Sequence, residues 1–217
     1  APTDNSLDAS WFKPGFDPRA AGWASGGFGF GYENSASGYA DLISTRVKPS
    51  ETAANARSIY TRMNFNVADP DAITGLILQM KYDDGFVAYL NGTEVMRANI
   101  NGAARFDSSA MSNHPDSHAL KFEDFTLPGA ALVAGINVLA VHAVNQSANS
   151  SDMLVIPQLV DGASGGGYFE NLLNGFAAQI SADAARDQRL WAAKGITSFN
   201  STLSDILNSF LPNRRTQ

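Results

Sequence analysis

Alternating apolar and polar positions predict that the first 160 residues form β-strands. Residues 58–67 (SIYTRMNFNV) alternate with a period of two, which is typical of a strand that buries one face. Further apolar runs predict strands at 76–82, 86–90, 93–96, 136–144 and 153–160. Turn-forming residues separate these runs, and a helical period is hardly present among them. The pattern therefore predicts a mostly β protein built as an antiparallel β-sandwich.

Two turn signals connect the middle strands. Asn91-Gly92 stands between two apolar runs and predicts a tight hairpin, because both residues tolerate positive φ. Asp83-Asp84-Gly85 predicts a second turn, since Asp favours turn positions and Gly supplies unusual φ values. Together these signals predict that successive strands pair as an antiparallel meander.

The first 32 residues combine glycine with many large aromatic side chains. Residues 26–32 read GGFGFGY, and Trp11 and Trp23 precede them. We interpret this segment as irregular chain that is pinned to the sandwich by its aromatic side chains, each able to bury on the order of 150–250 Å².

The pattern changes after residue 160. Residues 161–168 are rich in glycine and predict a flexible linker, and residues 169–217 predict a helical appendage. One apolar stripe recurs there at intervals of three and four, and it contains Phe199, Leu203, Ile206, Leu207 and Phe210. Such a face needs cover, so we expect it to pack on the sandwich, on the preceding helix or on another molecule, for example by joining copies of the chain into a homo-oligomer.

Composition excludes several classes of protein. The chain has 217 residues, no cysteine and a formal net charge of -6, which argues against disulfides, thiolate metal sites and nucleic-acid binding. No apolar run approaches the ~20 residues that span a bilayer, so we expect no membrane insertion. Charged residues are 17% of the chain, so Ser, Thr, Asn and Gly must cover much of the surface. That surface suits a secreted or cell-surface bacterial protein.

The sequence also resembles a known family. KYDDGFVAYLNGTEV at 81–95, with Tyr60-Thr61-Arg62 and GINVLAVH at 135–142, is similar to the galactose-binding-like jelly-roll module. This module occurs in secreted and surface proteins of bacteria, often beside lamin-tail-like and CotH-type domains. The resemblance covers residues 1–160, and the segment from 180 to 215 resembles the C-terminal helices of CotH-type proteins. It implies a non-catalytic module that binds a glycan or packs against a neighbouring surface protein, and that often holds a structural calcium ion.

Two groups of residues are candidate metal ligands. Asp83, Asp84 and Asp152 offer the hard oxygen atoms that Ca²⁺ prefers, although Asp83-Asp84-Gly85 is also explained by a turn. His114 and His118 are four residues apart, as two zinc ligands on a helix would be. Pro115 favours a loop instead, and no third ligand is evident from the sequence, so zinc is not favoured here.

Sugar recognition usually combines a flat aromatic face with fixed amide and guanidinium groups. The candidates of these types are Arg97, Asn99, Asn145, Trp23 and Tyr32. The alternative for the aromatic residues is that they belong to the core. No nucleophile elbow, phosphate loop or His-Glu-x-x-His motif is convincing, so we expect no enzyme activity. A polysaccharide-active hydrolase stays open as an alternative, because its two carboxylates can be distant in sequence.

Overall fold

A computed structural model describes residues 1–35, 38–52, 56–73, 75–127 and 132–162. The predicted helical appendage and most of the predicted linker lie outside the described residues. The strands are β1 (Phe30–Glu33), β2 (Thr45–Arg46), β3 (Ser58–Val67), β4 (Leu76–Asp83), β5 (Gly85–Leu90), β6 (Thr93–Ala98), β7 (Glu123–Leu127), β8 (Gly135–Val144) and β9 (Asp152–Asp161). Short helices are η1 (Asn5–Leu7), η2 (Ala40–Leu42), α1 (Pro49–Thr52), η3 (Pro70–Ala72) and α2 (Asp116–Ala119).

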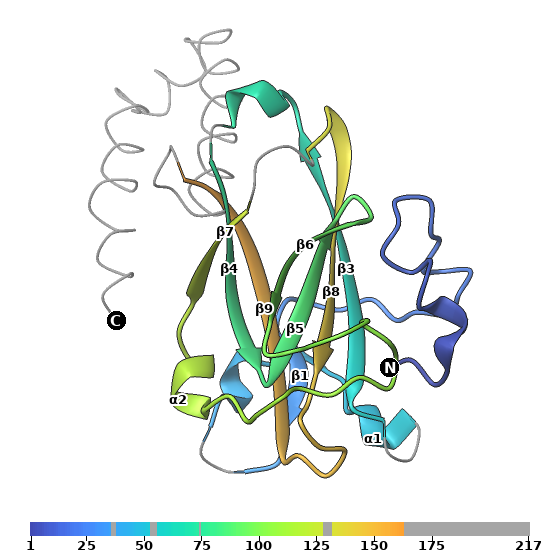
Figure 1. The fold of residues 1–217 in the computed structure, drawn as a ribbon, viewed down its shortest axis with the longest axis vertical. Coiled ribbons are helices and arrows are strands. Elements are labelled where there is room, and N and C mark those ends of the chain that lie inside the picture. Colours follow the sequence, from blue (N-terminus) through green and yellow to red (C-terminus); the bar gives the residue numbers. More distant parts are fainter. Residues whose placement is uncertain (36–37, 53–55, 74, 128–131, 163–217) are drawn as a thin grey trace, which may run out of the picture. The chain divides into compact units, whose positions relative to one another are not determined.

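The strands form two stacked sheets, which confirms the predicted β-sandwich (Figure 1). One sheet has five strands in the order β2-β1-β9-β4-β7, and the other has four in the order β3-β8-β5-β6. The pair β1–β2 is parallel and the other pairs are antiparallel. The long pair β3–β8 runs in one register from Ser58 opposite Val144 to Val67 opposite Gly135.

The predicted meander is wrong. Of the pairs that are consecutive along the chain, β1–β2 and β5–β6 are neighbours, whereas β3 pairs with β8 and β4 pairs with β7 and β9. Asp83 and Asp84 lead the chain from the five-stranded sheet into the four-stranded sheet instead of closing a hairpin. The Asn91-Gly92 hairpin is confirmed, with φ of 51° and 89° and Leu90 opposite Thr93. Residues 30–33, which we expected to be irregular, form β1 and pair with β9.

Side chains from alternate positions fill the space between the two sheets. Phe86 and Ala88 of β5 point into this core, as do Leu139 and Val141 of β8. The facing sheet contributes Leu78 and Met80 of β4 and Met153 and Val155 of β9. These side chains are almost completely buried, so their transfer from water is the main favourable term in folding this unit.

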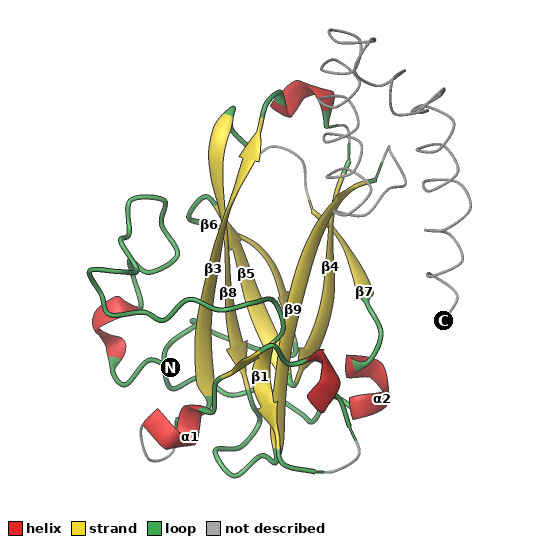
Figure 2. Cartoon of the chain, turned by 180° about the vertical axis from the view of Figure 1, so that it is seen from behind, coloured by secondary structure: helices red, strands yellow, loops and turns green. Residues whose placement is uncertain are grey.

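The outer face of the four-stranded sheet is also covered. Figures 1 and 2 show the N-terminal segment beside β3, on the side away from the other sheet. We call the rings that cover this face the aromatic layer: Trp11, Phe12, Phe16, Trp23, Tyr60 and Tyr89. Trp11 is 2% exposed and stacks on Tyr60 with ring centroids 4.2 Å apart. The expectation that aromatic side chains pin this segment to the sandwich is therefore confirmed.

Candidate functional sites

Asp84 ties together three parts of the chain at the crossing between the sheets. Its carboxylate accepts hydrogen bonds from the backbone N–H of His114 and of Gln146, each at 2.8 Å. Its own backbone N–H donates to the carbonyl of Val144 at 3.2 Å. Because Asp84 is 2% exposed and both carboxylate oxygens already accept hydrogen bonds, its evident role is structural.

Asp83 is buried beside Asp84, and this burial disfavours the ionised form of its carboxyl. Burial, followed by the interaction with Asp84, raises the pKa of the Asp83 carboxyl to about 9. The hydroxyl of Tyr39 donates a hydrogen bond to Asp83 Oδ2.

The three predicted calcium ligands lie in two different surroundings. Asp152 lies with Glu33 and Asp116, and one carboxylate oxygen from each lies within 4.8 Å of the others. Asp83 and Asp84 are engaged in the protein interior, for the reasons given above. Calcium stays a prediction, and of the three predicted ligands Asp152 is the one with this group of carboxylates beside it.

Two of the predicted carbohydrate-binding residues lie in the interior. Tyr32 is 2% exposed and Asn145 is 1% exposed. The Asn145 side-chain amide donates to the Tyr32 hydroxyl at 2.9 Å and to the carbonyl of Asp152 at 3.0 Å. The Tyr32 hydroxyl in turn donates to the carbonyl of Ser150 at 2.9 Å. Their burial corrects the prediction that they contact a ligand at the surface.

Asn99 holds the loop that follows β6. Its φ of 57° is in the left-handed region, which Asn tolerates better than most residues. Its side-chain amide donates to the carbonyls of Asp84 and Ser112 at 3.0 and 2.6 Å, and its Oδ1 accepts from the Ser112 hydroxyl at 3.0 Å. The side chain therefore has partners within the protein for its donors and for its acceptor.

Arg97 and Trp23 do reach the surface. Arg97 is opposite Val87, so it shares the outer face of the four-stranded sheet with that residue. Its guanidinium makes a two-pronged pair with Glu94 at 2.6 and 2.7 Å, and the side chain is 33% exposed. Trp23 is half-buried at the aromatic layer and stacks on Trp11 with centroids 6.2 Å apart. Both candidates thus lie on the outer side of the four-stranded sheet, Trp23 over edge strand β3 and Arg97 on the opposite edge strand, β6.

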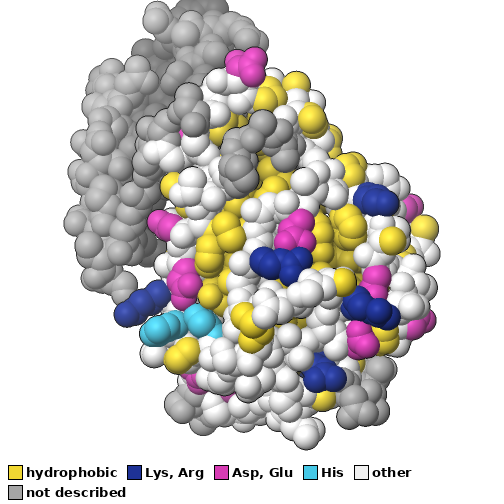
Figure 3. Space-filling model, in the orientation of Figure 1, with side chains coloured by type: hydrophobic (Ala, Val, Ile, Leu, Met, Phe, Trp, Pro, Cys, Tyr) yellow, Lys and Arg dark blue, Asp and Glu magenta, His cyan; other side chains and the backbone are white. Residues whose placement is uncertain are grey.

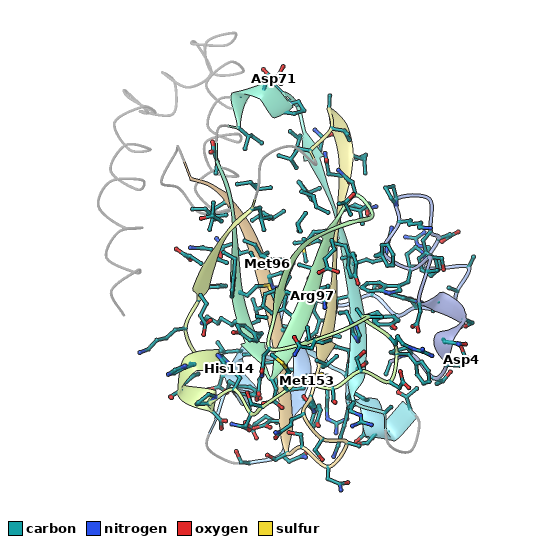
Figure 4. All side chains as sticks on the ribbon, viewed as in Figure 1. Asp4, Asp71, Met96, Arg97, His114 and Met153 are labelled. Carbon is teal, nitrogen blue, oxygen red and sulfur yellow. The ribbon has the colours of Figure 1, made fainter. Side chains whose placement is uncertain are left out.

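A group of three candidate metal ligands lies around α2, and the sequence had indicated only two of them. His114 precedes this helix, His118 belongs to it and Glu123 begins β7. One ligand atom from each of the three side chains lies within 4.8 Å of the others. Figure 3 shows histidine side chains side by side on the surface next to acidic groups, and Figure 4 labels His114 at this end of the sandwich.

Glu123 was missed because the stretch between His118 and Glu123 has no regular pattern, so the sequence did not show where Glu123 lies in space. It is brought close by strand pairing, since Glu123 lies opposite Met80 of β4. An acidic residue five positions after His118 was visible in the sequence, but nothing local showed that the chain folds back there.

Comparisons with known proteins give partial structural matches. No protein-family model and no curated protein matches the chain. A β-D-mannosidase from Dictyoglomus thermophilum matches 41% of the chain with 16% identity and a TM-score of 0.27. An α-L-rhamnosidase from Aspergillus terreus matches 49% with 16% identity and a TM-score of 0.34. A β-glucuronidase from an uncultured Clostridium species matches 41% with 19% identity and a TM-score of 0.27.

The matched parts are 9% to 12% of the length of those enzymes. Similarity at this level identifies neither a family nor an activity for this chain. The predicted links to lamin-tail-like and CotH-type domains are not supported by these comparisons. Within the described ranges, no helix has the length and apolar character needed to cross a bilayer.

Proposed function

We propose that this chain is a non-catalytic, extracellular β-sandwich module that binds carbohydrate through the surface made by its N-terminal segment and by β6, on the outer side of the four-stranded sheet. The observation that carries the proposal is the presence on this side of a half-buried ring, Trp23, over edge strand β3 and of the Arg97–Glu94 pair on the other edge strand, β6. Trp23 offers part of an aromatic ring, and the other two residues offer a fixed pair of charged groups beside Tyr89. A pyranose presents a C–H face that stacks on a ring and hydroxyls that bond to such groups.

The aromatic layer gives this face the rigidity that sugar binding needs. The rings of Trp23 and Phe16 pack edge to face, with centroids 5.5 Å apart. Trp23 also stacks on Trp11, and Trp11 stacks on Tyr60. Arg97 also donates to the carbonyl of Gly102 at 2.7 Å, which holds its guanidinium in place. Groups that are fixed before binding lose little conformational entropy when a ligand arrives.

A glycan array probed with the full chain, followed by isothermal titration of the sugars that bind, tests this proposal. Trp23→Ala and Arg97→Ala should each weaken binding by roughly tenfold, which is what losing about 1.4 kcal/mol of stacking or charged hydrogen bonding gives. Phe28→Ala is the matched control, because Phe28 is 55% exposed and lies outside the aromatic layer. A chain that binds no sugar would remove the carbohydrate proposal.

The non-catalytic part has its own test. The purified chain should release no reducing sugar from polysaccharides, including any that it binds on the array. Steady turnover that scales with protein concentration would contradict this part and favour the hydrolase alternative.

The predicted calcium ion is tested by melting the protein with and without EGTA. Binding to the native state alone raises stability by about 2.7 kcal/mol at a hundredfold excess of ion over Kd. A midpoint that EGTA leaves unchanged would exclude a tight structural calcium ion. Asp152→Asn should abolish any calcium effect, because Asp152 is the predicted ligand that lies with other carboxylates.

A further inference from the structure

We propose that His114, His118 and Glu123 form a site for a divalent transition metal of the Zn²⁺ class. This site lies around α2 and β7, and the proposal does not depend on carbohydrate binding. The sequence alone offered two histidines without a third ligand. The fold supplies that ligand from β7.

The contacts of His114 place one of its ring nitrogens against the third ligand. Its Nδ1 is 2.9 Å from the carbonyl oxygen of Tyr82, and its Nε2 is 2.9 Å from Glu123 Oε1. Nε2 and Oε1 are both atoms of the kind that bind Zn²⁺, and they already face each other across the short gap in which a metal ion would lie.

The contacts behind the ligands are those that orient a metal site. The Tyr82 carbonyl accepts from His114 Nδ1–H, which leaves the lone pair of Nε2 free for a metal. The Tyr82 hydroxyl donates to Glu123 Oε2 at 3.1 Å and so turns Oε1 toward His114. The Tyr82 ring also stacks on the His114 ring with centroids 4.2 Å apart. One residue of β4 therefore orients two of the three ligands.

The donor set selects the class of metal. Two imidazole nitrogens and one carboxylate suit Zn²⁺ and its neighbours in the first transition row, whereas Ca²⁺ and Mg²⁺ prefer oxygen ligands throughout. Three protein ligands leave one tetrahedral position for water or for a group on another molecule. His118 is exposed, so this open position faces solvent.

Metal binding requires the ligand atom of His118 to move closer to those of His114 and Glu123. The ligand atoms of a tetrahedral zinc ion lie about 3.3 Å apart when each is ~2.0–2.1 Å from the metal. His114 and Glu123 are already closer than this, at 2.9 Å, and the whole group lies within 4.8 Å. His118 is on the surface of a four-residue helix, so a rotation of its side chain can close the remaining distance.

Isothermal titration of the full chain with zinc chloride tests the site. We expect one zinc ion to bind and to raise the melting midpoint, and magnesium chloride at the same concentration to have neither effect. His118→Ala should weaken zinc binding by more than tenfold, because even residues behind the ligands contribute about 10- to 100-fold to affinity. Glu123→Gln should also weaken it, since the amide keeps the shape of the side chain but loses its charge.

Two variants on the same short helix are matched controls. Ser117→Ala changes an exposed neighbour of His118, and Asp116→Asn removes a member of the separate acidic group with Glu33 and Asp152. Both should bind zinc as the unaltered chain does, and His118→Ala should melt at an unchanged midpoint in EDTA, which shows that it folds.

Three results would overturn the proposal. The first is the absence of zinc binding at a concentration of about a hundred micromolar. The second is unchanged zinc affinity in His118→Ala, which would place the zinc elsewhere. The third is loss of zinc binding in Asp116→Asn with retention in Glu123→Gln, which would assign the ion to the acidic group.

Discussion

Two buried ionisable residues make the stability of the sandwich depend on pH in opposite directions. Asp83 keeps its proton in the native state because burial raises the pKa of its carboxyl to about 9. His142 resists protonation because burial lowers the pKa of its imidazole to about 3. Because each pKa differs between the native and the unfolded chain, each residue makes a contribution to the free energy of unfolding that varies with pH. Between about pH 3.8 and 6.5 the two contributions change in opposite directions and cancel, so together they lower stability only above and below this range.

The Asp83 contribution should decline as the solution becomes alkaline. The unfolded carboxyl loses its proton near pH 3.8 and the native one near pH 9, so the native state binds more protons between these values. Its stabilising effect is therefore complete below pH 3.8 and is lost as pH rises, by roughly 1 kcal/mol per pH unit. Asp83→Asn keeps a neutral side chain, so its free energy of unfolding in urea should fall less between pH 6 and 8.5.

The exposed carboxylate of Asp71 provides the control for that measurement (Figure 4). Asp71→Asn should retain the pH dependence of the unaltered chain. Equal slopes in Asp83→Asn and the unaltered chain would show that Asp83 is ionised in the native state.

The His142 contribution should be lost on the acid side. The unfolded imidazole takes up a proton near pH 6.5 and the native one near pH 3, so the unfolded state binds more protons between them. Stability from this residue is complete above pH 6.5 and falls as pH decreases. His142→Gln can keep a hydrogen bond to Ser58, which His142 Nε2 now contacts at 2.9 Å. Its unfolding free energy should therefore decrease less between pH 6.5 and 4.5.

A slope in His142→Gln as steep as that of the unaltered chain would contradict the assignment to His142.

Some residue-scale features were readable in the sequence and others were not. Asn91-Gly92 requires a local backbone conformation, so its two-residue signal was sufficient. The burial of Asp83 depends on the crossing between sheets and on Tyr39, which is distant along the chain. The sequence of two adjacent aspartates is the same whether they lie in an exposed turn or in the protein interior. Their carboxylates alone therefore suggested a calcium site.

At the scale of elements, the N-terminal segment behaves as a third layer held by β3. Arg62 of β3 donates from Nη1 to the carbonyls of Trp11 and Lys13 at 2.6 and 2.9 Å, and its guanidinium lies 5.5 Å from the Phe16 ring centroid. This layer explains why β5 and most of β8 are buried on both faces. It also explains why the first four residues of β3 are all buried, whereas a strand with one face in water alternates between buried and exposed residues.

Arg62→Ala should loosen this layer. Charged hydrogen bonds to two carbonyls are worth about 1.5–3 kcal/mol, so we expect a loss of about 2 kcal/mol in the free energy of unfolding in urea. Arg46→Ala is the control, because Arg46 pairs with Glu51 at the surface and such pairs contribute less than about 1 kcal/mol. Equal losses in the two variants would argue that Arg62 does not hold the segment.

Sequence patterns at this scale predicted the long strands but not their partners. The runs that became β3, β8 and β9 are ten residues each, so their alternation or apolar character was clear. β2 has two residues and β1 four, which is too short for a period to be seen. Pairing of β1 with β9 joins residues about 120 positions apart, and it is decided by the closure of the sheets.

At the scale of the whole molecule, self-association is the remaining prediction. The chain divides into two units at Ala163 and Ser164, and the apolar stripe predicted from the sequence belongs to the second. Association through this stripe would bury Leu203 and Leu207 against another copy of the chain. Light scattering of the full chain should then give a multiple of 23.1 kDa, and the double variant Leu203→Asp and Leu207→Asp should give a monomer. Ile136→Asp alters a side chain that is 65% exposed on the sandwich, so it should leave the mass unchanged. A monomeric mass for the unaltered chain would exclude the stripe as a contact between copies, and a multimeric mass for the double variant would move the contact to another surface.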